Sequence, residues 1–243
     1  MATVSIFDFL ARCQPLSDGF AALEAGDIWR LGSVLYARAG ASTALVQKAS
    51  VYGEAYQFAG LWALPGGMVR AETGYNGNHH GCFDLIRQSL VSRAALECGL
   101  QLSDMIDLGT TDRLGPIVTS YTAKERQRFT LMTVQRCRVG TAVCLSSKDR
   151  SIASAEWHEP PLEWGQLAPG NRLALAHLLW AELSETQRTT ARRAVEFALE
   201  QCADWAKTAG VVAPPSPWAD GTAIARWRTA WPYSFNEPDL PCD

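Results

Sequence analysis

Apolar residues recur in short runs along the chain, in the pattern that is typical of β-strands. β-branched, aromatic and aliphatic residues dominate the two runs that flank an Ala-Gly-Ala segment, and this arrangement is a hairpin signature. Similar runs return after the middle of the chain. The full set of predicted strands is 29–38, 42–49, 51–58, 61–65, 105–114, 127–140 and 152–159.

Glycines mark the expected ends of two elements. Gly66 and Gly67 predict a turn that closes the first group of strands, because a sharp change of chain direction favours glycine. A polar loop rich in Gly, Asn and His then leads into a predicted helix at about 83–98. We expect Asp84 to cap the start of this helix and Gly99 to end it.

Apolar residues at helical spacing predict three further helices, and together with the strands they place the chain in the α/β class. These helices cover 6–13, 171–182 and 186–207. The predicted organisation has three parts: an N-terminal helical segment, a body, and a C-terminal helix whose Pro- and Trp-rich tail packs on the body. Their limits are 1–25, 26–183 and 184–243.

Composition narrows the function classes. The chain has 243 residues, of which 47% are hydrophobic, enough for one substantial domain with an extension. A formal net charge of -3 is not typical of a protein that neutralises nucleic-acid phosphates. Seven scattered cysteines without a CxxC pair favour the reducing cytoplasm. No run of eighteen apolar residues occurs, so no membrane span is expected.

Two separated segments carry a recognisable motif. LWALPGGMVRAETG, residues 61–74, ends a predicted strand in Leu-Pro-Gly-Gly and places Glu72 six residues after the first glycine. SRAALECGL, residues 92–100, ends in Glu97, one spacer residue and a Gly-Leu pair. The two segments resemble the two halves of the Nudix box.

The resemblance to the Nudix hydrolase superfamily implies a fold and a chemistry. The implied fold is a Nudix-type α/β/α sandwich with a mixed sheet, followed here by a C-terminal helical extension. Nudix hydrolases cleave diphosphate bonds with magnesium, which polarises a phosphoryl oxygen and activates water. By this resemblance Glu97 would be the catalytic residue, and Glu97 and Glu72 would be metal ligands. Nudix proteins are often dimers, so a homodimer is a further expectation.

The second half of the box departs from the family's pattern where metal ligands are expected. Ser92 stands in place of an arginine, Arg93 in place of the first glutamate, and Leu96 in place of the penultimate glutamate. The segment 75–87 also separates the two halves further than usual. Because Mg²⁺ requires hard oxygen ligands, a guanidinium or an aliphatic side chain cannot replace a carboxylate. We therefore expect metal-dependent hydrolysis to be impaired or lost.

Arg93 has two alternative roles. It precedes Glu97 by four residues, so the two side chains share one face of the predicted helix and can form an ion pair. Alternatively, its planar guanidinium binds a phosphate or another anion directly. In that case the predicted substrate-binding residues are Arg93, Gly66, Gly67, Glu72 and Trp62.

Other residues could supplement the site. The inserted segment offers His79, His80 and Asp84 as metal ligands beside the two glutamates, although adjacent histidines do not easily point at one ion and are typical of a solvated loop. Several aromatic residues could stack on a base or pack in the core. They are Trp29, Tyr36 and Trp62.

Three functions follow from these observations. The first is a Nudix-fold protein that binds a nucleoside-diphosphate-linked or other phosphorylated small molecule, with hydrolysis impaired or lost. The second is an active hydrolase of a nucleoside diphosphate derivative that uses non-standard metal ligands. The third is a metabolite-sensing regulatory or interaction protein. No membrane partner is expected, and a nucleic-acid partner is disfavoured by the charge.

Overall fold

The structure is a computed structural model, and it describes nine stretches of the chain. They are residues 14–16, 19–24, 27–50, 58–69, 79–110, 117–123, 126–140, 143–209 and 213–224. Side chains are described from residue 31 onward, with some gaps inside the strands and helices.

The strands in these stretches form one mixed sheet. They are β1 (Gln14–Leu16), β2 (Gly19–Glu24), β3 (Asp27–Ala39), β4 (Ser42–Lys48), β5 (Trp62–Ala63), β6 (Gly66–Met68), β7 (Ile106–Thr110), β8 (Ile117–Ala123), β9 (Arg126–Arg138) and β10 (Ile152–His158). The predicted hairpin at 29–49 is confirmed, and it consists of β3 and β4. The strands predicted at 105–114, 127–140 and 152–159 are confirmed as β7, β9 and β10.

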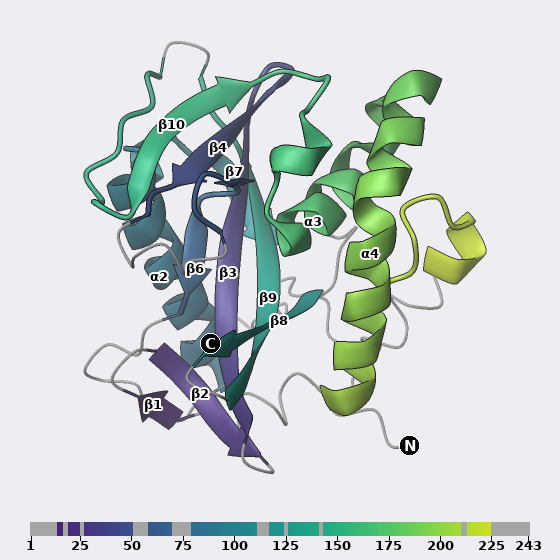
Figure 1. The fold of residues 1–243 in the computed structure, drawn as a ribbon. Coiled ribbons are helices and arrows are strands. Elements are labelled where there is room, and N and C mark those ends of the chain that lie inside the picture. Colours follow the sequence, from purple (N-terminus) through teal and green to yellow (C-terminus); the bar gives the residue numbers. More distant parts are fainter. Residues whose placement is uncertain are drawn as a thin grey trace, which may run out of the picture.

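The long strand β3 lies at the centre of the sheet (Figure 1). One of its edges pairs in parallel with β9 from Ile28 to Arg38. Its other edge pairs antiparallel with β2, β6 and β4 in succession. Strand β10 extends the sheet beyond β4, and β7 and β8 pair with the far edge of β9.

Helices cover both faces of the sheet, as the predicted α/β/α sandwich requires. Helix α2 (His79–Glu97) lies on one face, and α3 (Pro169–Leu179) and α4 (Glu185–Ala209) lie on the other (Figure 1). Alternate residues of β3 face the two layers: Leu35 packs in a core cluster with Leu90 of α2, and Tyr36 packs in a second cluster with residues of α3 and α4. Short 3₁₀ turns complete the layers: η1 (Leu102–Asp104), η2 (Trp164–Gln166) and η3 (Trp180–Glu182).

Two local predictions were wrong. Gly66 and Gly67 do not form a turn but lie in strand β6, which pairs with β3. A Cβ atom at Gly66 would stand 2.3 Å from the Ser33 carbonyl oxygen, and its φ is +137°, so glycine is required by the close approach of two strands. The box helix begins at His79, which places Asp84 inside the helix instead of at its cap.

The remaining predicted elements have different outcomes. The predicted N-terminal helix at 6–13 lies outside the described residues, and the segment that contains it also holds strands β1 and β2. The strand predicted at 51–58 lies outside the described residues except for Phe58, which is in a turn. Strand β8 was missed. The helices predicted at 171–182 and 186–207 are confirmed by α3 with η3 and by α4.

Part of the C-terminal tail packs on the helical layer. The Trp218 ring lies 5.4 Å from the Trp180 ring, centroid to centroid. The Arg192 guanidinium lies over both rings, at 5.6 Å from Trp180 and 5.4 Å from Trp218. Among the described residues, the helices include none that is long and apolar enough to cross a membrane.

Candidate functional site

Glu97 is the last residue of α2, and the chain around it explains why the helix stops there. Gly99 follows with φ +80°, a left-handed conformation that commonly ends helices. The loop before β10 then caps the free carbonyl groups: the Ser146 N–H donates to the Cys98 oxygen at 3.1 Å, and the Lys148 N–H donates to the Leu96 oxygen at 2.8 Å. This capping places the loop beside the Glu97 carboxylate.

Donor groups of the protein engage both oxygens of the Glu97 carboxylate. The backbone N–H of Gly66 donates to Oε2 at 2.7 Å. The Lys48 ammonium, at the end of β4, donates to Oε1 at 3.3 Å. The Glu97 side chain is only 2% exposed, so these contacts replace water almost completely.

Arg93 joins the same group from one helical turn earlier. Its Nη1 atom lies 3.8 Å from Glu97 Oε1, which confirms the predicted ion pair between residues four apart. The same nitrogen donates to Asp149 Oδ2 at 3.2 Å. Arg93 thus bridges the acid at the end of α2 and an acid in the loop before β10.

Asp149 is held in its charged form. Burial raises the pKa of this carboxyl, but hydrogen bonds from Ser151 and the charges of Arg93 and Lys48 outweigh burial, so the pKa lies below its usual value. We call Lys48, Arg93, Glu97 and Asp149 the box cluster. It contains two cations and two anions, so it is close to neutral without any added ion.

The described residues of the box cluster do not fit a magnesium ion. Mg²⁺ needs several oxygen ligands in octahedral geometry, whereas Glu97 already faces two cationic side chains and an N–H group. Within the described stretches, no group of three or more His, Cys, Asp or Glu residues could hold a metal ion. Glu72, the second predicted metal ligand, lies outside those stretches, as do the side chains of the other ligands predicted in the inserted segment.

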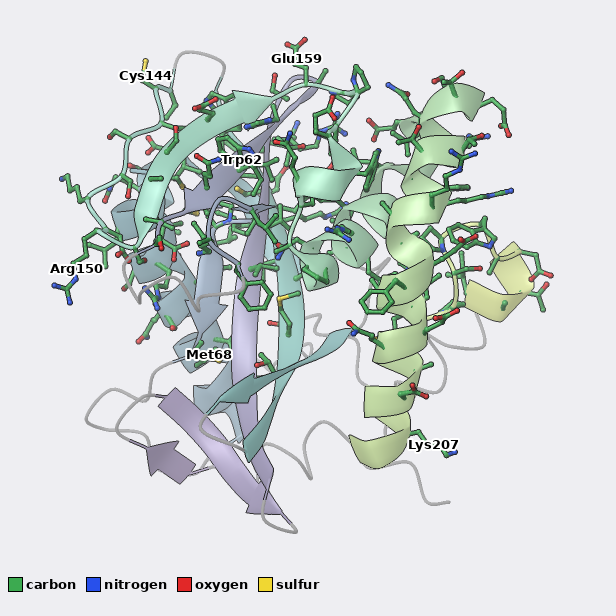
Figure 2. All side chains as sticks on the ribbon, viewed as in Figure 1. Trp62, Met68, Cys144, Arg150, Glu159 and Lys207 are labelled. Carbon is green, nitrogen blue, oxygen red and sulfur yellow. The ribbon has the colours of Figure 1, made fainter. Side chains whose placement is uncertain are left out.

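The predicted substrate-binding residues are only partly brought together. A Cβ atom at Gly67 would stand 3.5 Å from Arg93 Nη2, so Gly66 and Gly67 both line the box cluster with their backbone. Trp62 on β5 is half-buried (Figure 2). Its ring packs edge-on against His158 of β10, with 4.3 Å between the ring centroids. Burial lowers the pKa of His158, more strongly than the Glu156 charge raises it.

Two members of the box cluster were missed by sequence reasoning. Lys48 ends a predicted strand and Asp149 lies in a polar loop, and neither position carries a motif. Both are brought to α2 by contacts between residues about fifty positions apart. The sequence did contain one signal for this cluster, the four-residue spacing of Arg93 and Glu97. This spacing places an arginine in contact with the carboxylate that was predicted to bind the metal.

No protein-family model matches the sequence, and no curated protein does. Similar solved structures include a Nudix hydrolase from M. Smegmatis, which is 18% identical with a TM-score of 0.40 over 71% of this chain and 96% of that one. A MutT NUDIX hydrolase from Burkholderia pseudomallei is 14% identical with a TM-score of 0.38, over 60% and 95%.

A third similar structure is the NUDIX domain of Shewanella oneidensis NrtR complexed with ADP ribose. It is 16% identical with a TM-score of 0.34, over 54% of this chain and 71% of that one. In this chain, the two segments that resemble the halves of the Nudix box meet at Gly66 and Glu97, beside a mixed sheet that lies between helical layers.

Proposed function

We propose that this chain is a Nudix-fold protein that binds a phosphorylated small molecule, such as a nucleoside diphosphate derivative, and has lost metal-dependent diphosphate hydrolysis. The observation that carries the proposal is the saturation of the Glu97 carboxylate by Gly66, Lys48 and Arg93. An acid held in this way does not take part in metal binding or water activation without breaking contacts inside the protein.

The exposure of the box cluster supports binding of an anion over binding of a cation. The Glu97 side chain is 2% exposed, whereas Lys48 and Arg93 are 16% and 23% exposed. The acid that a metal would need is therefore the most enclosed group, and both cations reach solvent. Asp149, which is 17% exposed, serves as a counter-ion that a ligand phosphate displaces from Arg93.

In this proposal Arg93 supplies the charge that magnesium supplies in a Nudix hydrolase. Its guanidinium fork suits two oxygens of one phosphate, and the adjacent backbone of Gly67 admits close approach of a ligand because it has no side chain. Gly66, Glu72 and Trp62 remain proposed ligand-binding residues. A homodimer and a cytoplasmic location are also parts of the proposal.

Thermal-shift measurements with and without Mg²⁺ test the proposal. The probes are ADP-ribose and other nucleoside diphosphate derivatives, and released phosphate and monophosphate are assayed in parallel. We expect stabilisation that does not require Mg²⁺, no turnover, and loss of the stabilisation in Arg93→Lys, which keeps the charge but not the fork. Arg150→Lys, in the exposed loop beside the site, is the matched control (Figure 2).

Two results would overturn this proposal. Mg²⁺-dependent release of product that disappears in Glu97→Gln would favour the active hydrolase with non-standard ligands. Stabilisation by none of the probes would favour a regulatory or interaction role, in which the box cluster only holds α2 to the sheet.

A further inference from the structure

Two buried polar atoms beside Gly67 have no hydrogen-bond partner among the described residues. They are the Ser33 hydroxyl on β3 and the Nε atom of Arg93 on α2. Ser33 is only 2% exposed. The Nη1 atom of Arg93 already contacts Asp149 and Glu97, so the box cluster satisfies one side of this guanidinium and leaves its Nε side unsatisfied.

Strand register places Ser33 on the face of the sheet that carries α2. Ser33 lies opposite Gly67 in the antiparallel pair of β3 and β6, and such opposed residues point to one face with Cβ atoms about 4.5–5.5 Å apart. A Cβ atom at Gly67 would stand 3.5 Å from Arg93 Nη2 and 3.7 Å from Nε. Leu35, two residues along β3, packs with Leu90 of α2 on the same face. Ser33 from the sheet and Arg93 from the helix thus flank the position of a Gly67 side chain.

Glycine at position 67 is not required by the fold. Its φ is not positive, and the nearest atom to a Cβ there would be Arg93 Nη2 at 3.5 Å, an ordinary van der Waals contact. Gly66 is different, because a Cβ atom there would stand 2.3 Å from the Ser33 carbonyl oxygen. The Arg93 side chain is 23% exposed, so a ligand reaches it from solvent. The effect of glycine at position 67 is to keep the Nε side of Arg93 open to a ligand atom.

The Ser33 hydroxyl and the Arg93 Nε–H group require the same kind of partner. The Nε–H group of a guanidinium is a donor only, and a hydroxyl needs an acceptor for its proton. Buried donors without an acceptor cost free energy and are uncommon in folded proteins. One oxygen with free lone pairs, placed beside Gly67, accepts hydrogen bonds from both groups. An anionic oxygen binds more strongly there than a neutral one, because the guanidinium is charged.

We propose that a non-bridging phosphoryl oxygen of the ligand enters beside Gly67 and accepts hydrogen bonds from Arg93 Nε and from the Ser33 hydroxyl. This inference rests on the proposed function and adds two residues that determine its specificity. The other oxygens of the phosphoryl group stay on the solvent side of Arg93, where Asp149 binds in the free protein. Ser33 and Gly67 thus select an unsubstituted, charged oxygen, as in a phosphate monoester or a diphosphate, over an ester oxygen or an N–H group.

Isothermal titration of the whole chain with ADP-ribose, ADP and orthophosphate, without Mg²⁺, tests this inference. Two variants change the position beside Gly67 without changing any charge. Ser33→Ala removes one donor and should weaken binding of the tightest probe about tenfold, because hydrogen bonds to charged groups are among the stronger ones. Gly67→Ala places a methyl group against the Nε side of Arg93 and should weaken binding by about tenfold or more, because it blocks the ligand oxygen from both donors.

The melting temperature without ligand separates this effect from a folding defect. Ser33→Ala should melt at an equal or higher temperature, since it removes a buried hydroxyl that has no partner among the described residues. Gly67→Ala should do the same, because alanine restricts the unfolded chain and meets no clash in the folded one. The matched controls are Ser42→Ala, which removes an exposed hydrogen bond to Glu159, and Gly109→Ala in β7. Both controls should leave binding unchanged.

The outcomes separate this inference from the proposed function. Weaker binding by both variants, with no loss of melting temperature, supports it. Binding that is lost in Arg93→Lys but unchanged in Ser33→Ala or in Gly67→Ala overturns it and leaves the proposed function standing. A lower melting temperature of Ser33→Ala also overturns it, because the hydroxyl would then have a partner in the free protein, such as a bound water. Absence of binding by all three probes overturns both proposals.

Discussion

The box cluster differs in enclosure from the end pocket, a cavity whose polar lining is Tyr36, Arg38, Asp107, Arg136, Arg138 and Glu182. Both regions are built from the same kinds of side chain. In the box cluster Lys48, Arg93 and Asp149 surround a glutamate that is 2% exposed. In the end pocket the Arg138 and Asp107 side chains are 72% and 70% exposed. Ion pairs weaken when solvent reaches them, so the first region should contribute more to stability than the second. Four predictions test this difference, and three of them compare the two regions directly.

The largest effect is expected for Glu97→Gln. This change leaves Lys48 and Arg93 beside a neutral amide in an enclosed site, and removing one partner of a buried pair costs about 3–5 kcal/mol. The melting temperature should fall by about 6–20 °C for a chain of this length. Glu182→Gln in the end pocket also removes a carboxylate from an arginine, but the Glu182 side chain is 45% exposed. Its cost should be about 1 kcal/mol or less.

Calorimetry or urea unfolding of the two variants side by side measures the difference. Equal destabilisation by both substitutions would show that enclosure does not separate the two regions. That result would contradict the view that the enclosed contacts of Glu97 stabilise the fold by holding β6 to the end of α2.

Gly66→Ala should rank next. A Cβ atom there would stand 2.3 Å from the Ser33 carbonyl oxygen and 2.8 Å from the Val34 Cα atom, and φ +137° disfavours any side chain, so we expect a cost of about 2–3 kcal/mol. Gly109→Ala, in β7 beside the end pocket, meets no atom within 4 Å and should change the unfolding free energy by about 0.5 kcal/mol or less. The denaturant midpoints of the two variants provide the measurement. A large loss for Gly66→Ala alone indicates steric strain at Gly66, whereas equal losses indicate that alanine destabilises any strand glycine of this sheet.

The contrast also shows which parts of the molecule could be predicted from the sequence. Runs of β-branched, aromatic and aliphatic residues located β3, β4 and β9, and apolar residues at helical spacing located α4. The same patterns missed β8 (Ile117–Ala123), where serine and threonine interrupt the apolar run. The sequence analysis also predicted a turn at Gly66 and Gly67. The sequence does not reveal that β6 lies so close to β3 that a Cβ atom at Gly66 would clash with the Ser33 carbonyl oxygen.

The candidate site residues were also predicted only where local geometry brings them together. Arg93 and Glu97 were found together because they lie four residues apart on one helix, where local geometry is regular. The end pocket was not found, although Tyr36 and Arg38 alternate on one strand and Arg136 and Arg138 on another. Their meeting depends on the parallel register of β3 with β9, which is set by long-range packing.

A third, smaller effect should appear on acidification. The pKa of Asp149 is lowered in the folded protein, so this carboxyl contributes stability above its unfolded pKa, near 4, and the contribution is lost as the pH falls through the folded value. Unfolding free energies of the wild type and Asp149→Asn should therefore differ at pH 7 and converge as the pH falls below the unfolded pKa, near 4. A difference that stays constant across this range would mean that Asp149 acts through its hydrogen bonds alone and not through its charge.

The smallest effect is expected from salt, and it discriminates the regions most directly. Arg138→Gln removes an exposed pair worth about 0.2–1 kcal/mol at low ionic strength, and that difference should vanish when salt is raised to about 1 M, where charges are screened within about 3 Å. Lys48→Gln should remain destabilising at both salt concentrations, because its partner Glu97 is enclosed. Urea unfolding of both variants at the two ionic strengths provides the measurement. If salt weakened the Lys48 effect as much as the Arg138 effect, water would have access to Glu97, and the enclosure of this carboxylate would not keep a metal ion out of the box cluster.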